Sequence, residues 1–198
     1  EYHRMANQIV EIPLIIGVAG NQGYDYWRES RAQAAGDAFF EAVIANEPLE
    51  ALISISPDLP DGYQMLAKFR MAALQAKNEN KTDAEQSYLA LSRDAAIEPF
   101  YQETALLLSV MNAPDAVNKN ELIERISELT KFAGPLQGLA LETTAGLYLE
   151  LDNPEKAIST LLQASELTDI SPSLRQRMSQ SLLLLQSNYG DLSSTGTE

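Results

Sequence analysis

The part of this 198-residue chain that most constrains its fold is residues 141–167, where two helical hydrophobic patterns flank a short polar break. Apolar residues recur at spacings of three and four, as on one face of each of two helices: Leu141, Ala145, Tyr148 and Leu151, then Ala157, Leu161, Ala164 and Leu167. Pro154 disfavours helical conformation in the residue before it and suits the first turn of a helix, while Asn153 can cap that turn. The stretch therefore predicts two antiparallel helices, which the small alanine side chains allow to approach closely.

Similar breaks divide the rest of the chain into helical segments. The predicted helices cover residues 24–46, 48–54, 62–77, 82–93, 100–112, 121–132 and 171–188, besides the two of the opening stretch. Thr82 and Glu85 fit a capping box, and Asn118 or Asn120 can cap the helix of residues 121–132. On that last helix, Glu121 can pair with Arg125, and Glu128 with Lys131, which predicts a solvated charged face.

The predicted helices can be grouped in pairs, and an alanine recurs near the start of the second helix of several pairs. Ala51 and Ala84 lie 33 residues apart, and Ala157 follows after two further periods of about 36 residues; the unit of residues 99–131 lacks the alanine. Helical hairpins that recur in the middle thirties are typical of tetratricopeptide arrays, which stack into solenoids. We predict an all-α, right-handed solenoid of degenerate tetratricopeptide-like hairpins, preceded by an N-terminal helix, with the repeat domain over residues 24–188 and a disordered tail over residues 189–198.

Charge and composition exclude several classes of function. The chain has 28 acidic and 14 basic residues, a net charge of −14, which repels the phosphate backbones of nucleic acids. The acidity favours solubility, and attraction of a basic partner is the alternative. With no cysteine and with His3 as the single histidine, cysteine-based zinc sites and Ser–His–Asp or Cys–His catalysis lack their parts. We expect no catalytic residue, no metal and no cofactor.

The N-terminal segment, residues 1–23, contains the most apolar part of the sequence. Residues 9–20 are apolar except for interruptions such as Glu11 and Pro13, and a membrane span needs roughly 20 residues. Three glycines and an aromatic cluster follow, an order typical of a transmembrane helix that meets the headgroup layer. Residues 1–23 are therefore expected to be the remnant of a membrane anchor, with Tyr24, Tyr26 and Trp27 at the membrane interface. The alternative is that these aromatic side chains anchor the core of the first soluble helix.

Residues 17–41, GVAGNQGYDYWRESRAQAAGDAFFE, resemble the beginning of bacterial inner-membrane proteins with a tetratricopeptide-like domain, the ancillary Sec-translocon subunit family. The resemblance implies one membrane helix, a periplasmic repeat domain, and a role beside the translocon and with periplasmic chaperones, without catalysis. The short apolar segment, interrupted by Glu11 and Pro13, departs from the family pattern.

The sequence supports two hypotheses of function. The first is a protein-binding scaffold at the inner membrane that faces the periplasm, with an apolar or basic segment as its ligand. The positions expected to line its concave face are Phe40, Val43, Phe69, Lys77, Leu139, Glu142, Leu149 and Glu150. The second is a structural or oligomerisation module in the cytoplasm with no link to the translocon, in which residues 24–40 form a self-association helix.

Overall fold

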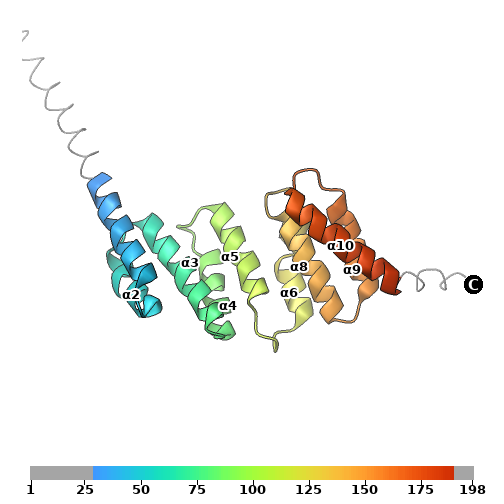
Figure 1. Ribbon diagram of the computed structural model, residues 1–198, viewed down its shortest axis with the longest axis horizontal. Helices are drawn as coiled ribbons and strands as arrows, with labels where there is room; N and C mark the ends of the chain where they lie inside the picture. Colours follow the sequence, from blue (N-terminus) through green and yellow to red (C-terminus); the bar gives the residue numbers. More distant parts are fainter. Residues whose placement is uncertain (1–28, 190–198) are drawn as a thin grey trace, which may run out of the picture. The chain divides into compact units, whose positions relative to one another are not determined.

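The computed structural model describes residues 29–189, and across this range every regular element is a helix (Figure 1). The all-α prediction is thereby confirmed. Tyr24, Tyr26 and Trp27, the predicted boundary after residue 23, and residues 190–198 of the predicted tail lie outside the described range. None of the helices within residues 29–189 is both long and apolar enough to cross a bilayer.

The chain divides into two compact units, residues 1–71 and residues 72–198, called the N-terminal and C-terminal units below. The described part of the N-terminal unit contains a helix over residues 29–44, α2 (Pro48–Ile55), the short 3₁₀ helix η1 (Ser56–Asp58) and most of α3 (Asp61–Lys77). The C-terminal unit contains the end of α3 followed by α4 (Lys81–Ser92), α5 (Pro99–Met111), α6 (Lys119–Arg125), α7 (Ser127–Lys131), α8 (Gln137–Glu150), α9 (Pro154–Ser165) and α10 (Pro172–Tyr189). The last helix thus runs one residue into the predicted tail.

Small residues determine the packing of the N-terminal unit. The helix of residues 29–44 buries Ala35 and Ala42. A Cβ atom on Gly36 would lie 2.8 Å from the hydroxyl oxygen of Tyr63, so this helix and α3 approach closely at that point. The ring of Phe39 lies 6.1 Å from that of Tyr63, a tilted aromatic contact.

Three helices of the C-terminal unit begin in the same way. The side-chain oxygens of Asn80, Asn118 and Asn153 accept hydrogen bonds from backbone amides at the starts of α4, α6 and α9, over 3.5, 2.9 and 3.1 Å. Each bond satisfies an amide that has no partner within its own helix. The caps predicted at Asn118 and Asn153 are confirmed. The capping box predicted at Thr82 is wrong, because Thr82 lies inside α4 and Asn80 caps that helix.

The positions that follow each cap are buried in the same order. Four residues after each asparagine comes a fully buried side chain, and a second follows after four more. The two sets are Ala84, Leu122 and Ala157, then Tyr88, Ile126 and Leu161. The local pattern predicted from the alanines is therefore present at Ala84 and Ala157, and Leu122 takes the place of alanine between them. It is not present at Ala51 of α2, which is half-buried and follows no side-chain cap.

Two hydrophobic clusters form the core of the later helices, and α8 contributes to both. The first joins α5, α6 and α8, and the second joins α8, α9 and α10. Successive helices lie side by side, with α4 on α5, α8 on α9 and α9 on α10, while α6 and α7 both contact α8 (Figure 1). Burial of one apolar face per helix against its neighbours explains why the hydrophobic spacing predicted these elements so well.

The predicted continuous helix over residues 121–132 is interrupted. α6 ends at Arg125 and α7 begins at Ser127, with Ile126 between them at φ −103° and ψ 8°. Two guanidinium nitrogens of Arg125 hold the end of α6: one donates to Glu85 of α4 over 2.7 Å and the other to Glu121 over 3.0 Å. The Glu121–Arg125 pair is confirmed, and Glu85, expected in a capping box, instead binds a residue 40 positions later.

Candidate functional site

The binding positions predicted on the first helix of each hairpin lie in both the N-terminal and the C-terminal unit. Phe40 and Val43 lie on the helix of residues 29–44, where 62% of Phe40 is exposed and Val43 is half-buried. Phe69 is half-buried on α3, in the N-terminal unit, and Lys77 is exposed at the end of the same helix, in the C-terminal unit. These four positions remain predictions.

The four positions predicted on α8 have different surroundings. Leu139 packs against both hydrophobic clusters, whereas Leu149 is exposed. Glu142 accepts two hydrogen bonds from Arg177 of α10, over 3.0 and 2.7 Å, and Glu150 pairs with Lys119 of α6 over 2.8 Å. A basic ligand would therefore compete at both carboxylates with a cation of the chain itself.

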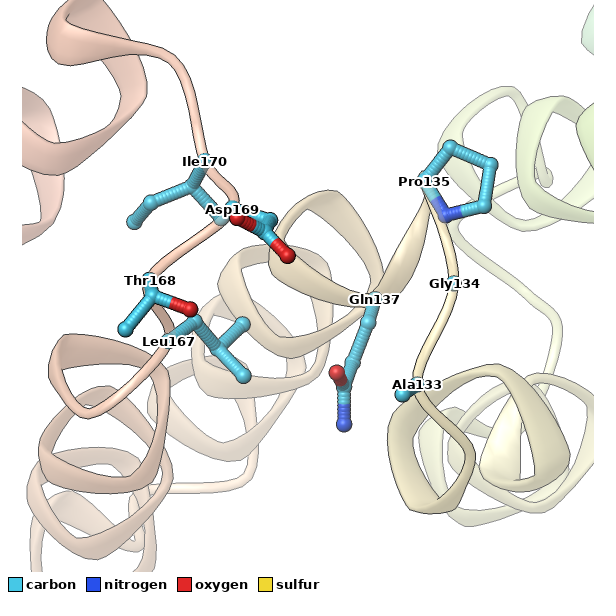
Figure 2. Close-up of a pocket in the computed structure, with 8 residues that line it drawn as sticks. All are labelled: Ala133, Gly134, Pro135, Gln137, Leu167, Thr168, Asp169 and Ile170. Atoms are coloured by element: carbon cyan, nitrogen blue, oxygen red, sulfur yellow. The ribbon is translucent and has the colours of Figure 1, made fainter.

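A pocket of about 520 Å³ lies between the loop that joins α7 to α8 and the loop that joins α9 to α10 (Figure 2). Its lining residues come from both loops and the start of α8: Ala133, Gly134, Pro135, Gln137, Leu167, Thr168, Asp169 and Ile170. The side chain of Gln137 lies between the two loops in Figure 2, and its amide nitrogen donates to the carbonyl oxygen of Thr130 over 3.1 Å.

A smaller hollow of about 120 Å³ adjoins this pocket, because Ala133, Gly134 and Gln137 line both. Its other walls are formed by α5, α7, the residue just after α7 and the residue just before α8: Glu103, Glu128, Leu129, Phe132 and Leu136. We call the pocket and the hollow together the loop groove. Its surface combines aliphatic and aromatic carbon with carboxylate oxygens, so it can contact apolar groups and bind cations.

Local sequence explains how the loop groove forms. α7 ends at Lys131, the next residue, Phe132, has an extended backbone, and Gly134 and Pro135 follow before α8. The amide of Gln137 donates to the carbonyl oxygen of Gly134 over 3.1 Å and closes the turn into α8. On the opposite wall, Gly138 admits the α9–α10 loop, since a Cβ atom there would lie 2.8 Å from Cγ2 of Ile170.

The loop groove has an excess of negative charge. Lys131 donates to Glu128 over 2.9 Å, which confirms the predicted pair. This hydrogen bond, with the charges of Glu128 and Glu124, raises the pKa of the Lys131 ammonium above its ordinary value. Among residues 29–189, Glu103 and Asp169 have neither a hydrogen-bond partner nor an ion-pair partner for their side chains, so two carboxylates of the groove are available to a ligand.

Sequence reasoning missed the loop groove because it searched the helix faces. No binding position was predicted at residues 133–135 or 168–170, which fall between predicted helices. Leu167 was predicted on a helix face, but α9 ends at Ser165 and Leu167 lies in the loop that lines the pocket. An available signal was Phe132, a large apolar residue just before a glycine–proline turn, of which 66% is exposed.

Within residues 29–189, no group of three acidic or histidine side chains is arranged to bind a metal. Comparisons with protein-family models, with curated proteins and with solved structures found no match to the chain. The all-helical architecture, its exposed surface and the sequence are therefore what supports an inference of function.

Proposed function

We propose that the chain is a non-catalytic scaffold for protein–protein interaction, built as a right-handed solenoid of degenerate tetratricopeptide-like hairpins over residues 24–188. The observation that carries the proposal is the threefold recurrence of an asparagine cap followed by two buried positions, at Asn80, Asn118 and Asn153. Units of this kind stack on their neighbours and leave an extended surface, which repeat proteins use to bind other proteins.

Exposed apolar side chains supply that surface. In the C-terminal unit they occur on α5, just after α7, and on α8, α9 and α10: Phe100, Tyr101, Met111, Phe132, Leu149, Leu162, Leu183 and Leu184. Single exposed apolar residues are common, whereas groups of them mark interaction sites. The recurrence of exposed apolar residues along one unit therefore supports binding of an elongated partner.

The resemblance of residues 17–41 to ancillary Sec-translocon subunits suggests where the scaffold works. On this basis, it is anchored at the bacterial inner membrane, faces the periplasm and binds translocon components or periplasmic chaperones. Affinity purification of the tagged full chain after chemical crosslinking in cells tests this, with the same tag on an unrelated acidic protein as the control. Recovery of translocon or chaperone components supports the proposal, and recovery of cytosolic partners alone overturns the periplasmic version.

An oligomerisation module is the second candidate, favoured by one specific observation. Phe40 and Ile44 lie four residues apart on one face of the helix of residues 29–44, and both are more than half exposed. Self-association through this face predicts a mass above that of the monomer in light scattering, reduced by Phe40→Ser. A monomer at all concentrations would exclude this alternative.

A further inference from the structure

We propose that the loop groove binds a short segment of a partner protein in which arginine or lysine alternates with aliphatic residues. The cation binds the carboxylate of Glu103, and the aliphatic side chains pack on Phe132 and Leu129. This inference rests on the proposed scaffold function and deepens it, because it assigns the site of binding and the chemistry of the bound segment.

The apolar part of the site is formed by residues that the fold leaves uncovered. Phe132 is 66% exposed, and with Leu129 it lines the hollow beside Glu103. Phe100, also exposed, precedes Glu103 by three residues on α5, so both lie on the same helix face. Its ring makes an edge-on contact with Tyr101 at 5.5 Å. Aromatic surface beside a carboxylate suits a guanidinium group, which stacks on rings while it donates to oxygen.

Charge determines which occupant fits. The carboxylates of Glu103 and Asp169 have no partner within residues 29–189, and Glu128 uses only one oxygen for Lys131. With a net charge of −14, a second copy of the chain would bring further negative charge, as would a nucleic acid or an anionic membrane. A basic segment is therefore the partner whose charge balances the carboxylates of the loop groove.

The extent of the groove indicates a segment rather than a single side chain. The hollow that contains Glu103 and the pocket that contains Asp169 share Ala133, Gly134 and Gln137. Gln137, which lies between the two loops in Figure 2, uses its amide nitrogen for Thr130, so its carbonyl oxygen can accept from a peptide N–H. A chain that crosses Gln137 thus places one cation at Glu103 and another at Asp169.

Fluorescence polarisation with the full chain and a labelled peptide of alternating arginine and leucine tests the chemistry of the occupant. We expect binding that weakens as salt concentration rises. A peptide with glutamate in place of arginine should not bind, and one with serine in place of leucine should bind more weakly. Absence of binding by the arginine–leucine peptide overturns the proposal, as does equal binding by either control peptide.

Two pairs of variants test the position of the site. Glu103→Gln should weaken binding of the arginine–leucine peptide about tenfold, because a charge-assisted hydrogen bond is lost. Glu155→Gln removes the same charge from the first turn of α9, outside the groove, and should have less than about a twofold effect. Phe132→Ser should weaken binding about fivefold, whereas Ile53→Ser, at an exposed isoleucine of α2 in the N-terminal unit, should not. Equal effects within either pair would show non-specific attraction and overturn the assignment.

The same variants separate this inference from the function on which it depends. If crosslinking of the unaltered chain recovers no partner protein, the scaffold function itself fails. A second outcome is that the unaltered chain recovers partners, and the double variant Glu103→Gln, Phe132→Ser recovers the same partners in the same amounts. The scaffold function then stands, and the loop groove is not the binding site. Loss of those partners from the double variant alone supports the groove, with circular dichroism to show that the variant is folded.

Discussion

Two hairpins of the C-terminal unit differ in how closely their helices pack. α8 and α9 are joined by a tight turn over residues 151–153, and they pack against each other along their lengths. α5 and α6 are joined by the longer loop of residues 112–118, and they contact each other sparsely. The helical segment that follows this loop is interrupted at Ile126. Both second helices have an asparagine cap, so the cap does not cause the difference.

The side chain four residues after the cap explains why α8 and α9 pack more closely than α5 and α6. Ala157 occupies this position in α9 and Leu122 occupies it in α6, and both are fully buried. The distance between packed helices depends on the side chains at their contact, so leucine holds α6 farther from its partner than alanine would. The residues after the break, Leu129 and Phe132, line the loop groove. The looser hairpin is therefore the one that provides exposed apolar surface for binding.

The largest expected effect comes from Leu122→Ala. Leu122 is 1% exposed in the cluster with Leu107 and Val110, so the truncation leaves a cavity and should lower the free energy of unfolding by about 3 kcal/mol. Urea denaturation measures this, with Leu183→Ala at an exposed position as a control that should change it by less than about 0.5 kcal/mol. A loss below about 1 kcal/mol would mean that the Leu122 side chain is not tightly packed in this cluster, and it would contradict the role of Leu122 in setting the distance between α6 and its neighbours.

The reciprocal change, Ala157→Leu, tests the tight hairpin. Ala157 has no exposed surface between closely packed α8 and α9, so a larger side chain forces shifts that should cost about 2 kcal/mol. Urea denaturation of this variant and of Ala84→Leu, at the matching position of α4, provides the comparison. If Ala157→Leu were neutral, alanine at this position would not determine how closely the helices approach.

Local sequence patterns predicted most of the helices, because the start of a helix and the ion pairs along it depend on residues that are close in the sequence. Asn153 and Pro154 marked the start of α9, and the four-residue spacing of Glu121 and Arg125 marked an ion pair on α6. Local reasoning was wrong where a tertiary contact decides the outcome. Glu85 fitted a capping box with Thr82, but its carboxylate binds Arg125 on a distant helix. The break at Ile126 has no proline or glycine at its position, so no local signal marked it.

The binding surface was harder to predict than the helices. The predicted positions followed from helical phase in an ideal array, which assumes that all hairpins pack alike. Glu142 and Glu150 fit that phase, yet both pair with cations of this chain, and Leu139 is part of the core. The loop groove arises where loops from two hairpins meet, and its residues are separated in the sequence by the length of a hairpin. The repeat pattern of the sequence does not show where loops from different hairpins come together.

The tight hairpin also contains a buried side-chain oxygen without a hydrogen-bond partner. Thr144 of α8 is buried and its hydroxyl oxygen makes no hydrogen bond. Thr144→Val removes that hydroxyl with little change in shape and should raise the free energy of unfolding by about 1 kcal/mol in urea denaturation. Thr160→Val on α9 is the matched control, because the Thr160 hydroxyl donates to the carbonyl oxygen of Lys156 over 2.8 Å. A gain at Thr160 as large as that at Thr144 would contradict this explanation.

The smallest expected effects lie in the turns. Glu79 and Asp152 precede the caps of α4 and α9 with positive φ of 62° and 54°, which lets the next amide donate back to Gln75 and Tyr148. Glycine adopts this conformation without strain, and aspartate tolerates it better than glutamate. Glu79→Gly should therefore stabilise the fold by about 1 kcal/mol and Asp152→Gly by about half of that, as measured by thermal unfolding.

Glu155→Gly, inside the first turn of α9, is the control for these turn variants. Its backbone is helical, so glycine there should destabilise the fold by about 0.5 kcal/mol through the greater freedom of the unfolded chain. The loop of residues 112–118 has no residue with positive φ, so the strain belongs to the tight turns alone. A loss of stability at both Glu79 and Asp152 would mean that strain at the αL position does not distinguish the tight turns from the longer loop. Equal gains would mean that aspartate tolerates this conformation no better than glutamate.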